Sequence, residues 1–238
     1  TPATDDTTSV RGNIITTHVT DADATDTHVI SKVNNAEANV GTKISGTYGD
    51  ITIEADGSYI YTLRNTDGNV QALAQGETEP DVFAVTVKDR KGDETTQNLT
   101  ITVNGTNDAP VISLTADDSD AGSVVESDAK HLTDNGTLTL TDSDLHDTVS
   151  TAVTKVEVSG TGQHSGYIPT NDELRSMLKA SGSLSDTQTT GTISWSFDSG
   201  EKTFDYLAAG ETLELKYTIK ATDSSGAVVE RPVTVTVT

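Results

Sequence analysis

Apolar residues alternate with threonine or serine along much of the chain. This period of two is clearest in Ile51–Ile53, Tyr59–Leu63, Leu138–Leu140 and Val233–Val237. It is typical of half-buried antiparallel strands, because successive side chains of a strand point to opposite faces of the sheet. Asp-Gly and Asn-Gly turn pairs punctuate these runs. The pattern therefore predicts an all-β fold, with about seven short strands per domain arranged as an antiparallel β-sandwich.

Helix is expected in few places. The best candidate is Asp172–Leu178, because Thr170 and Glu173 have the spacing of a capping box just after Pro169. In a capping box, each of the two side chains accepts a hydrogen bond from the backbone N–H of the other residue. A single helical turn is also expected around Val70–Ala74.

The chain contains an internal repeat. Residues 58–103 align with residues 192–237 without a gap, and residues 20–27 align with residues 141–148 at a smaller offset. The change of offset means that the second copy carries an insertion, at about residues 159–190. Self-similarity over this length indicates tandem domains.

The boundary between the two domains is expected in the turn-rich stretch Asn104–Pro110, because proline is excluded from central strands. The sequence thus predicts one domain over residues 1–108 and a second, with the insertion, over residues 109–238. Hydrophobic residues are only 33% of the chain and aromatic residues 4%, so each core must be thin. Four aromatic residues fall on strand positions that should face the core, namely Tyr61, Trp195, Phe197 and Tyr217.

Charge and cysteine content exclude several functional classes. The formal net charge is −22, and a protein this acidic repels phosphate backbones and anionic lipids, so neither nucleic acid nor a membrane surface is an expected partner. No apolar run approaches the ~18 residues of a membrane-spanning helix, so membrane insertion is not expected. Without cysteine, neither a disulfide nor a thiolate metal site is available. The acidic residues have two interpretations, solubility of the surface or calcium binding.

Several segments of the repeat resemble the VCBS repeats of large bacterial surface proteins, a cadherin-like branch of the immunoglobulin-like sandwiches. The segments are Asp56–Tyr61, Val70–Leu73, Asp81–Phe83 and Gly105–Pro110 in the first copy, and Trp195–Phe197, Phe204–Thr212 and Tyr217 in the second. The resemblance implies two tandem cadherin-like domains from a long calcium-dependent adhesin of the repeats-in-toxin (RTX) type. It further implies type I secretion to the bacterial cell surface.

Two aspartate clusters follow predicted strands and are candidate calcium ligands. Calcium takes six to eight oxygen ligands, which closely spaced aspartates and backbone carbonyls can supply. Neither cluster is an EF-hand loop, because the glycine at the sixth position and the glutamate at the twelfth are missing. The alternative interpretation is an Asx turn or a solvated loop. The candidates are Asp21, Asp23 and Asp26 in the first copy and Asp142, Asp144 and Asp147 in the second.

Strand direction adds ligands to each cluster. In a seven-stranded sandwich the relevant strand ends lie at the pole where the chain enters the domain, and in cadherin-like chains this is where interdomain calcium binds. We therefore expect the turn residue Asp223, with Asn107 and Asp108 of the linker, beside the second cluster. The corresponding additions to the first cluster are Asp89 and either Asp5 or Asp6.

No catalytic residues are predicted. The five histidines show neither a metal-ligand spacing nor an obvious serine and carboxylate partner set, and no carboxylate pair stands out for glycoside hydrolysis. The sequence therefore predicts a non-enzymatic extender, a monomeric fragment whose partners are the neighbouring repeats of its own chain. The repeats would hold the adhesive domains away from the cell during attachment or biofilm formation. The alternative is a module that binds host or environmental glycans, proteins or peptides through the insertion.

Overall fold

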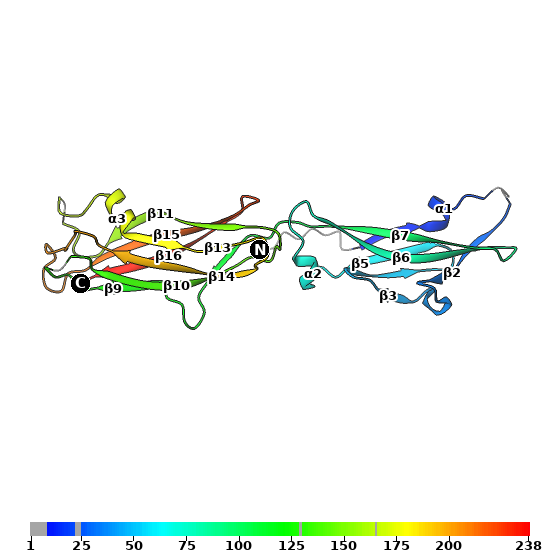
Figure 1. Ribbon diagram of the computed structural model, residues 1–238, viewed down its shortest axis with the longest axis horizontal. Coiled ribbons are helices and arrows are strands. Elements are labelled where there is room, and N and C mark those ends of the chain that lie inside the picture. The colour runs from blue at the N-terminus through cyan, green and yellow to red at the C-terminus, as the bar shows by residue number, and fades with distance from the viewer. Residues whose placement is uncertain (1–8, 22–24, 129, 165) are drawn as a thin grey trace. The chain divides into compact units, whose positions relative to one another are not determined.

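The computed structural model describes residues 9–21, 25–128, 130–164 and 166–238. The fold is all-β, as the sequence predicts, with 51% of the residues in strands and 8% in helices. The chain divides into two compact units, unit 1 (Thr1–Thr106) and unit 2 (Asn107–Thr238), each of which is visible as a separate bundle of strands in Figure 1. Asn107 and Asp108 therefore begin unit 2.

Unit 1 contains two antiparallel sheets, with strand orders β1-β5-β4-β3 and β2-β6-β7. Short helical segments connect some of the strands: α1 (Ile14–His18), η1 (Glu37–Asn39) and α2 (Gly68–Gln71). The strands are β1 (Ser9–Asn13), β2 (His28–Val33), β3 (Lys43–Ser45), β4 (Gly49–Ile53), β5 (Ser58–Leu63), β6 (Thr78–Asp89) and β7 (Glu94–Asn104).

The core of unit 1 lies between these sheets and is small. Tyr61 of β5 meets Phe83 of β6 edge to face, with ring centroids 6.3 Å apart. The alternating residues Ile51 and Ile53 of β4 are fully buried beside them. Burial on every second residue is what the apolar–threonine alternation predicts.

A buried carboxylate also fixes unit 1. Asp81 is only 2% exposed, and it accepts hydrogen bonds from the backbone N–H groups of Thr47, Tyr48 and Gly49 and from the Tyr61 hydroxyl, at 2.9–3.2 Å. Burial, and then the bond to this carboxylate, raise the pKa of Tyr61. Four donors satisfy the buried charge, so Asp81 anchors the β3–β4 turn to β6 and is structural.

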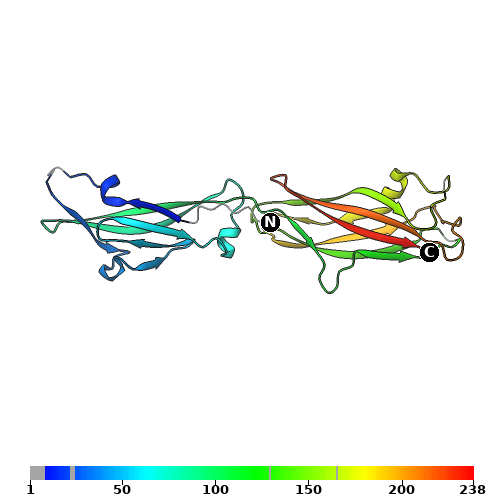
Figure 2. The ribbon, with the colours of Figure 1, turned by 180° about the vertical axis from the view of Figure 1, so that it is seen from behind.

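Unit 2 also contains two sheets, with strand orders β12-β14-β10-β8 and β13-β11-β15-β16-β9. All of its strand pairs are antiparallel except β9 with β16, which is parallel; Figure 2 shows β16 as the red strand that ends near the C-terminus. The strands are β8 (Val111–Ser113), β9 (Ala121–Val124), β10 (Thr133–Thr141), β11 (Val149–Ser159), β12 (Leu178–Ser181), β13 (Ser183–Leu184), β14 (Thr190–Asp198), β15 (Leu213–Asp223) and β16 (Val228–Val237).

The core of unit 2 is built around Trp195 and Tyr217, which are both buried, as their strand positions predict. Trp195 packs so closely on Gly136 that a Cβ atom at this glycine would lie 2.5 Å from the indole ring. The Tyr217 hydroxyl donates to the Leu174 carbonyl oxygen at 3.0 Å and so ties the helix of the insertion to the core.

That helix, α3 (Asn171–Met177), starts as the sequence predicts. Both hydrogen bonds of the capping box between Thr170 and Glu173 are present. The helix packs beside β11 and leads directly into β12 (Figure 1). The remainder of the insertion therefore carries strands as well as the helix, since β12 and β13 both lie within it.

The repeat found in the sequence corresponds to equivalent strands. At the offset of residue 58 to residue 192, β5 matches β14, β6 matches β15 and β7 matches β16. At the smaller offset of residue 20 to residue 141, β2 matches β11. These pairings allow individual positions of the two units to be compared.

Candidate metal centre

Three aspartates of unit 2 converge where strands β10, β11 and β15 meet one end of the sandwich. Asp142, Asp147 and Asp223 each bring one carboxylate oxygen to a common point, with these oxygens within 4.8 Å of one another. All three side chains are buried. Among the residues that the structure describes, no other set of three histidine, aspartate or glutamate side chains meets this distance.

The strands position these three residues. Asp142 directly follows β10, Asp147 lies two residues before β11, and Asp223 is the last residue of β15. Asp223 lies opposite Val149, the first residue of β11, in the antiparallel ladder. The beginning of β11, the end of β15 and the start of the loop after β10 thus lie at one pole of unit 2.

The first residues of unit 2 contact this cluster. The backbone N–H of Asp108 donates to Asp144 Oδ2 at 2.7 Å, and Asn107 Nδ2 donates to Asp223 Oδ2 at 3.0 Å. Asp144 is 1% exposed, and its own N–H donates to Asp142 Oδ1 at 3.2 Å. The two residues that begin unit 2 are thereby bound to the loop after β10 and to the end of β15.

Hydrogen bonds also fix the shape of the loop after β10. The N–H of Asp142 donates to the Thr189 carbonyl at 3.0 Å, and the N–H of His146 donates to the Asp186 carbonyl at 2.8 Å. Asp147 Oδ1 accepts from the N–H of Thr148 at 2.6 Å and from the N–H and hydroxyl of Ser224. The loop therefore holds its carboxylates inward.

Four side chains of this cluster also have an oxygen atom that is buried without a hydrogen-bond partner. A buried polar atom without a partner is costly, and for a charged group the cost is larger. Among the described residues, no lysine or arginine forms an ion pair with the carboxylates of the cluster, which are those of Asp142, Asp144, Asp147 and Asp223. A bound cation would satisfy the four oxygens, which are Asn107 Oδ1, Asp142 Oδ2, Asp144 Oδ1 and Asp147 Oδ2.

The donor set fits a hard divalent cation. Carboxylate and amide oxygens are the ligands that calcium prefers, in shells of six to eight. Asp142, Asp147 and Asp223 can share one ion, while Asn107 and Asp144 extend the set of oxygen donors toward the start of the unit.

Burial and mutual repulsion make these carboxylates hard to ionise without a cation. Burial, reinforced by the charges of Asp147, Asp223 and Asp108, raises the pKa of Asp142 to about 6. Burial, reinforced by the charges of Asp108, Asp142 and Asp147, raises the pKa of Asp144 to about 7. Near neutral pH, a cation would therefore remove a substantial electrostatic penalty.

The counterpart in unit 1 is arranged differently. Asp21 Oδ2 lies 2.9 Å from His28 Nε2, Asp26 Oδ1 accepts from the Thr27 N–H at 2.8 Å, and Asp89 Oδ1 accepts from the Asp93 N–H at 2.7 Å. These three aspartates do not form a group with ligand atoms within 4.8 Å. Asp5, Asp6 and Asp23 lie outside the described residues. A calcium site in unit 1 stays a prediction.

Comparison with known proteins bears mainly on unit 1. Residues 1–105 match the bacterial cadherin-like domain family, which is less than half of the chain. No curated protein matches the sequence. No helix in the described part of the chain has the length and apolar character needed to cross a membrane.

Similar solved structures include cadherins and a pilin. Extracellular cadherin domains 3–6 of protocadherin gamma B2 are 14% identical, with 89% of this chain and 41% of that chain covered and a TM-score of 0.37. Human CDH23 EC21-23 is 15% identical, with 90% and 58% covered and a TM-score of 0.36. The CooA pilin subunit from enterotoxigenic Escherichia coli is 16% identical, with 55% and 98% covered and a TM-score of 0.34. The chain thus spans less than two thirds of the cadherin structures, and similarity at this level says nothing about ligands.

The raised pKa values predict an unusual dependence of stability on pH. A carboxyl whose pKa is higher in the folded than in the unfolded chain binds protons more tightly when folded. The ion-free protein therefore loses stability as the pH rises from about 4 to about 7, and the loss is complete above the folded pKa values. Replacing Asp144 by asparagine removes one of the charges and keeps an oxygen that can accept from Asp108.

In chelator, Asp144→Asn should thus become more stable than the wild type as the pH rises from 5 to 7, by on the order of 2 kcal/mol. Urea unfolding followed by the fluorescence of Trp195 measures this in unit 2, because Trp195 is the one tryptophan of the chain. Equal pH slopes for the two proteins would show that the buried carboxylate carries no such penalty. Asp186→Asn, at an exposed position, is the matched control.

Proposed function

We propose that the chain is a calcium-stiffened extender segment of a long bacterial adhesin, with each unit serving as one VCBS-type repeat. The observation that carries the proposal is the set of four buried oxygens without partners, one on Asn107 at the start of unit 2 and three in the loop after β10. The match of residues 1–105 to the bacterial cadherin-like family supports an adhesion or extender role.

The first residues of unit 2 explain how calcium would act mechanically. Asn107 and Asp108 directly follow the last residue of unit 1, and both are hydrogen-bonded to side chains of the acidic cluster. Without a cation, the carboxylates repel one another and this attachment is strained. With calcium bound, the repulsion is removed, and Asn107 Oδ1 gains a positively charged partner. The backbone at the start of unit 2 would then lose its freedom to swing.

Calcium is the preferred ion on physical grounds. Magnesium requires a small octahedral shell and holds its water tightly, whereas calcium accepts the larger and less regular shell that several aspartates and an amide provide. Extracellular calcium modules bind in the range of about 10⁻⁴ to 10⁻³ M. We propose that the protein lies outside the cell, on the bacterial surface, after export by type I secretion as part of an RTX-type adhesin. There it would support attachment and biofilm formation. Its partners in this role are neighbouring repeats of the same chain.

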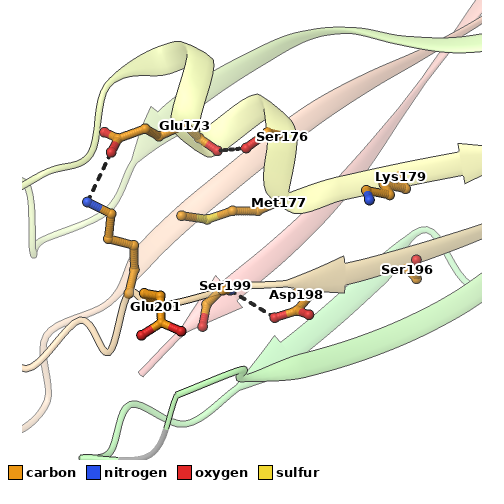
Figure 3. A pocket seen from close by; sticks show the side chains of 10 residues that line it. Glu173, Ser176, Met177, Lys179, Ser196, Asp198, Ser199 and Glu201 are labelled. Atoms are coloured by element: carbon orange, nitrogen blue, oxygen red, sulfur yellow. Dashed lines mark hydrogen bonds and ion pairs between the residues drawn. The ribbon is translucent and has the colours of Figure 1, made fainter.

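A second candidate function is ligand binding by the insertion. Tyr167 is 69% exposed and its ring lies 5.9 Å from that of Tyr206, beside a cavity of about 430 Å³. An adjacent cavity of about 460 Å³ lies between α3 and the loop after β14, where Figure 3 shows Glu173 paired with a lysine side chain across the opening. That lysine is Lys202, at 3.0 Å.

Exposed aromatic rings beside polar side chains can bind sugars or peptides. Glycan capture by the wild type on an array, lost in Tyr167→Ala and unaffected by Asp144→Ala, would favour this binding role. Binding that survives Tyr167→Ala would exclude the aromatic surface.

The extender proposal predicts specific stabilisation by calcium. A ligand that binds only the folded protein stabilises it by about 2.7 kcal/mol at a hundredfold excess over Kd. We expect a gain of this order for unit 2 in calcium, a smaller gain in magnesium, and loss of most of it in Asp144→Ala. Thermal or urea unfolding followed by Trp195 fluorescence gives the values.

Two controls separate a bound ion from charge screening. Asp186→Ala, in the insertion, should retain the full gain because its side chain is exposed. Sodium chloride at matched ionic strength should not reproduce the difference between the wild type and Asp144→Ala. If salt and calcium raised the stability of both proteins equally, the gain would be screening and the bound-ion proposal would fail.

The mechanical part of the proposal predicts that calcium restricts the motion of the two units. The chain has no cysteine, so a double variant with Thr66→Cys in unit 1 and Thr187→Cys in unit 2 can carry one spin label in each unit. Both positions are exposed. Pulsed electron resonance should show a broad distribution of label distances in chelator and a narrow one in calcium. When Asp144→Ala is added to the labelled protein, the distribution of label distances should stay broad in calcium. An unchanged distribution in the calcium-bound wild type would contradict the extender role.

A further inference from the structure

Unit 1 has a second group of metal-binding side chains whose chemistry differs from that of the acidic cluster in unit 2. A cavity of about 400 Å³ lies where β2 begins and β6 ends. Among the described residues that line it, there is no lysine or arginine. Its potential ligands are two imidazoles and three carboxylates, from His18, Asp21, His28, Asp89 and Asp93.

We propose that this cavity binds a borderline transition-metal cation such as Zn²⁺, through imidazole nitrogens and carboxylate oxygens. Imidazole suits zinc and related ions, whereas calcium and magnesium prefer oxygen ligands alone. The site would therefore favour zinc over calcium, in place of the calcium that the sequence predicts for Asp21 and Asp89.

Two ligands already lie near the spacing that zinc requires. His28 Nε2 is 2.9 Å from Asp21 Oδ2, and two ligands of a tetrahedral zinc ion, at bond lengths near 2.0–2.1 Å, are about 3.3 Å apart. A cation can therefore replace the shared proton of this pair with a small movement. Asp89 lies directly opposite His28 in the β2–β6 ladder, so the two side chains share one face of the sheet.

The hydrogen bonds around His18 select the tautomer that can bind a metal. The Thr17 hydroxyl donates its one proton to the Asn13 carbonyl at 2.5 Å. The same hydroxyl oxygen lies 2.5 Å from His18 Nδ1, so in a neutral imidazole Nδ1 must be the donor. The proton is then absent from Nε2, which keeps its lone pair. In metal-binding histidines, the ring nitrogen that does not bind the metal typically donates its N–H to a neighbouring protein group in this way.

Comparison of equivalent positions shows why unit 1 differs. Asp21 and Asp89 correspond to Asp142 and Asp223 of unit 2, so the carboxylates recur. Where unit 1 has His28, however, unit 2 has Val149, which is buried. Where unit 1 has Asp93, unit 2 has Ala227. An imidazole at the first position of β2 is thus a feature of unit 1, since β11 begins with valine at the equivalent position.

Completing the coordination shell requires side-chain movement. Three or more of these ligand atoms do not yet lie within 4.8 Å of one another. Asp93 is exposed at the rim of the cavity, so rotation about its side-chain bonds can move it toward the His28–Asp21 pair, whereas His18 would have to approach with its bond to Thr17 intact. This ordering lowers the affinity relative to a preformed site.

Calorimetric titration of the full chain with ZnCl₂ tests the proposal, with calcium present throughout to occupy the acidic cluster of unit 2. We expect one zinc ion per chain. His28→Val, which introduces the residue that unit 2 has at this position, should weaken binding at least about tenfold, and His18→Gln should weaken it as well. Circular dichroism of the full chain, compared with that of the wild type, verifies that the variants remain folded.

The chain supplies matched control histidines. His131 and His164 each contact a carboxylate in unit 2, at 3.0 Å and 2.7 Å, but neither lines the unit 1 cavity. His131→Gln and His164→Gln should bind zinc as the wild type does. In addition, Co²⁺ should give the stronger visible absorption of a low-coordinate site with nitrogen ligands, and His28→Val should abolish it.

Two results would overturn the proposal. Zinc binding that survives both His28→Val and His18→Gln would place the ion elsewhere. Loss of zinc binding in the wild type when the calcium concentration is raised further would show an oxygen-ligand site instead. Either outcome leaves the calcium proposal for unit 2 intact, because Asp144→Ala tests that site separately.

Discussion

The structure of unit 2 depends on how the negative charge of its acidic cluster is balanced. Four aspartates are buried within one strand-end loop and its neighbours, and two of them have a pKa raised toward neutrality. Because native domains are only marginally stable, unit 2 has little free energy with which to offset unsatisfied buried charge. The attachment of the first residues of the unit, through Asn107 and Asp108, depends on the same cluster. The attachment of the first residues and the repulsion among the carboxylates therefore depend on the same buried charge, which the proposed cation would balance.

The two units carry different side chains at equivalent strand ends. The strand ends after β6 and β15 are equivalent, and each presents an aspartate to the same pole. Asp81 shows that a buried carboxylate need not be a ligand, because four donors already satisfy it. Asp81 and the aspartates of the unit 2 cluster are all buried carboxylates. They differ in whether every oxygen has a hydrogen-bond partner. A carboxylate with unpartnered oxygens points to a bound ion, whereas a fully bonded one points to a structural anchor.

Much of the fold follows from local pattern. The period-two runs identify β4, β5, β10 and β16, and the Thr170–Glu173 spacing identifies the start of α3. The repeat also places Asp142 and Asp223 at equivalent strand ends. Other features depend on contacts between distant residues, which no local pattern records. The helix α1 forms where the equivalent residues of unit 2 continue a strand, because Asn13 caps it through a bond to the Thr16 N–H. His18 and His28 show no metal-ligand spacing, and only the fold and the ladder that pairs β2 with β6 bring them to one cavity.

The parallel pairing of β9 with β16 has a consequence for a protein under tension. β9 lies near the beginning of unit 2 and β16 at its end, and the two run in the same direction. Pulling the ends of the unit apart slides these strands along each other, so that their hydrogen bonds are loaded together in shear instead of opening one at a time. The ion pair between Arg231 and Asp120, at 2.9 Å, reinforces the same seam. The unit thus has a mechanical clamp that resists force without any help from a metal.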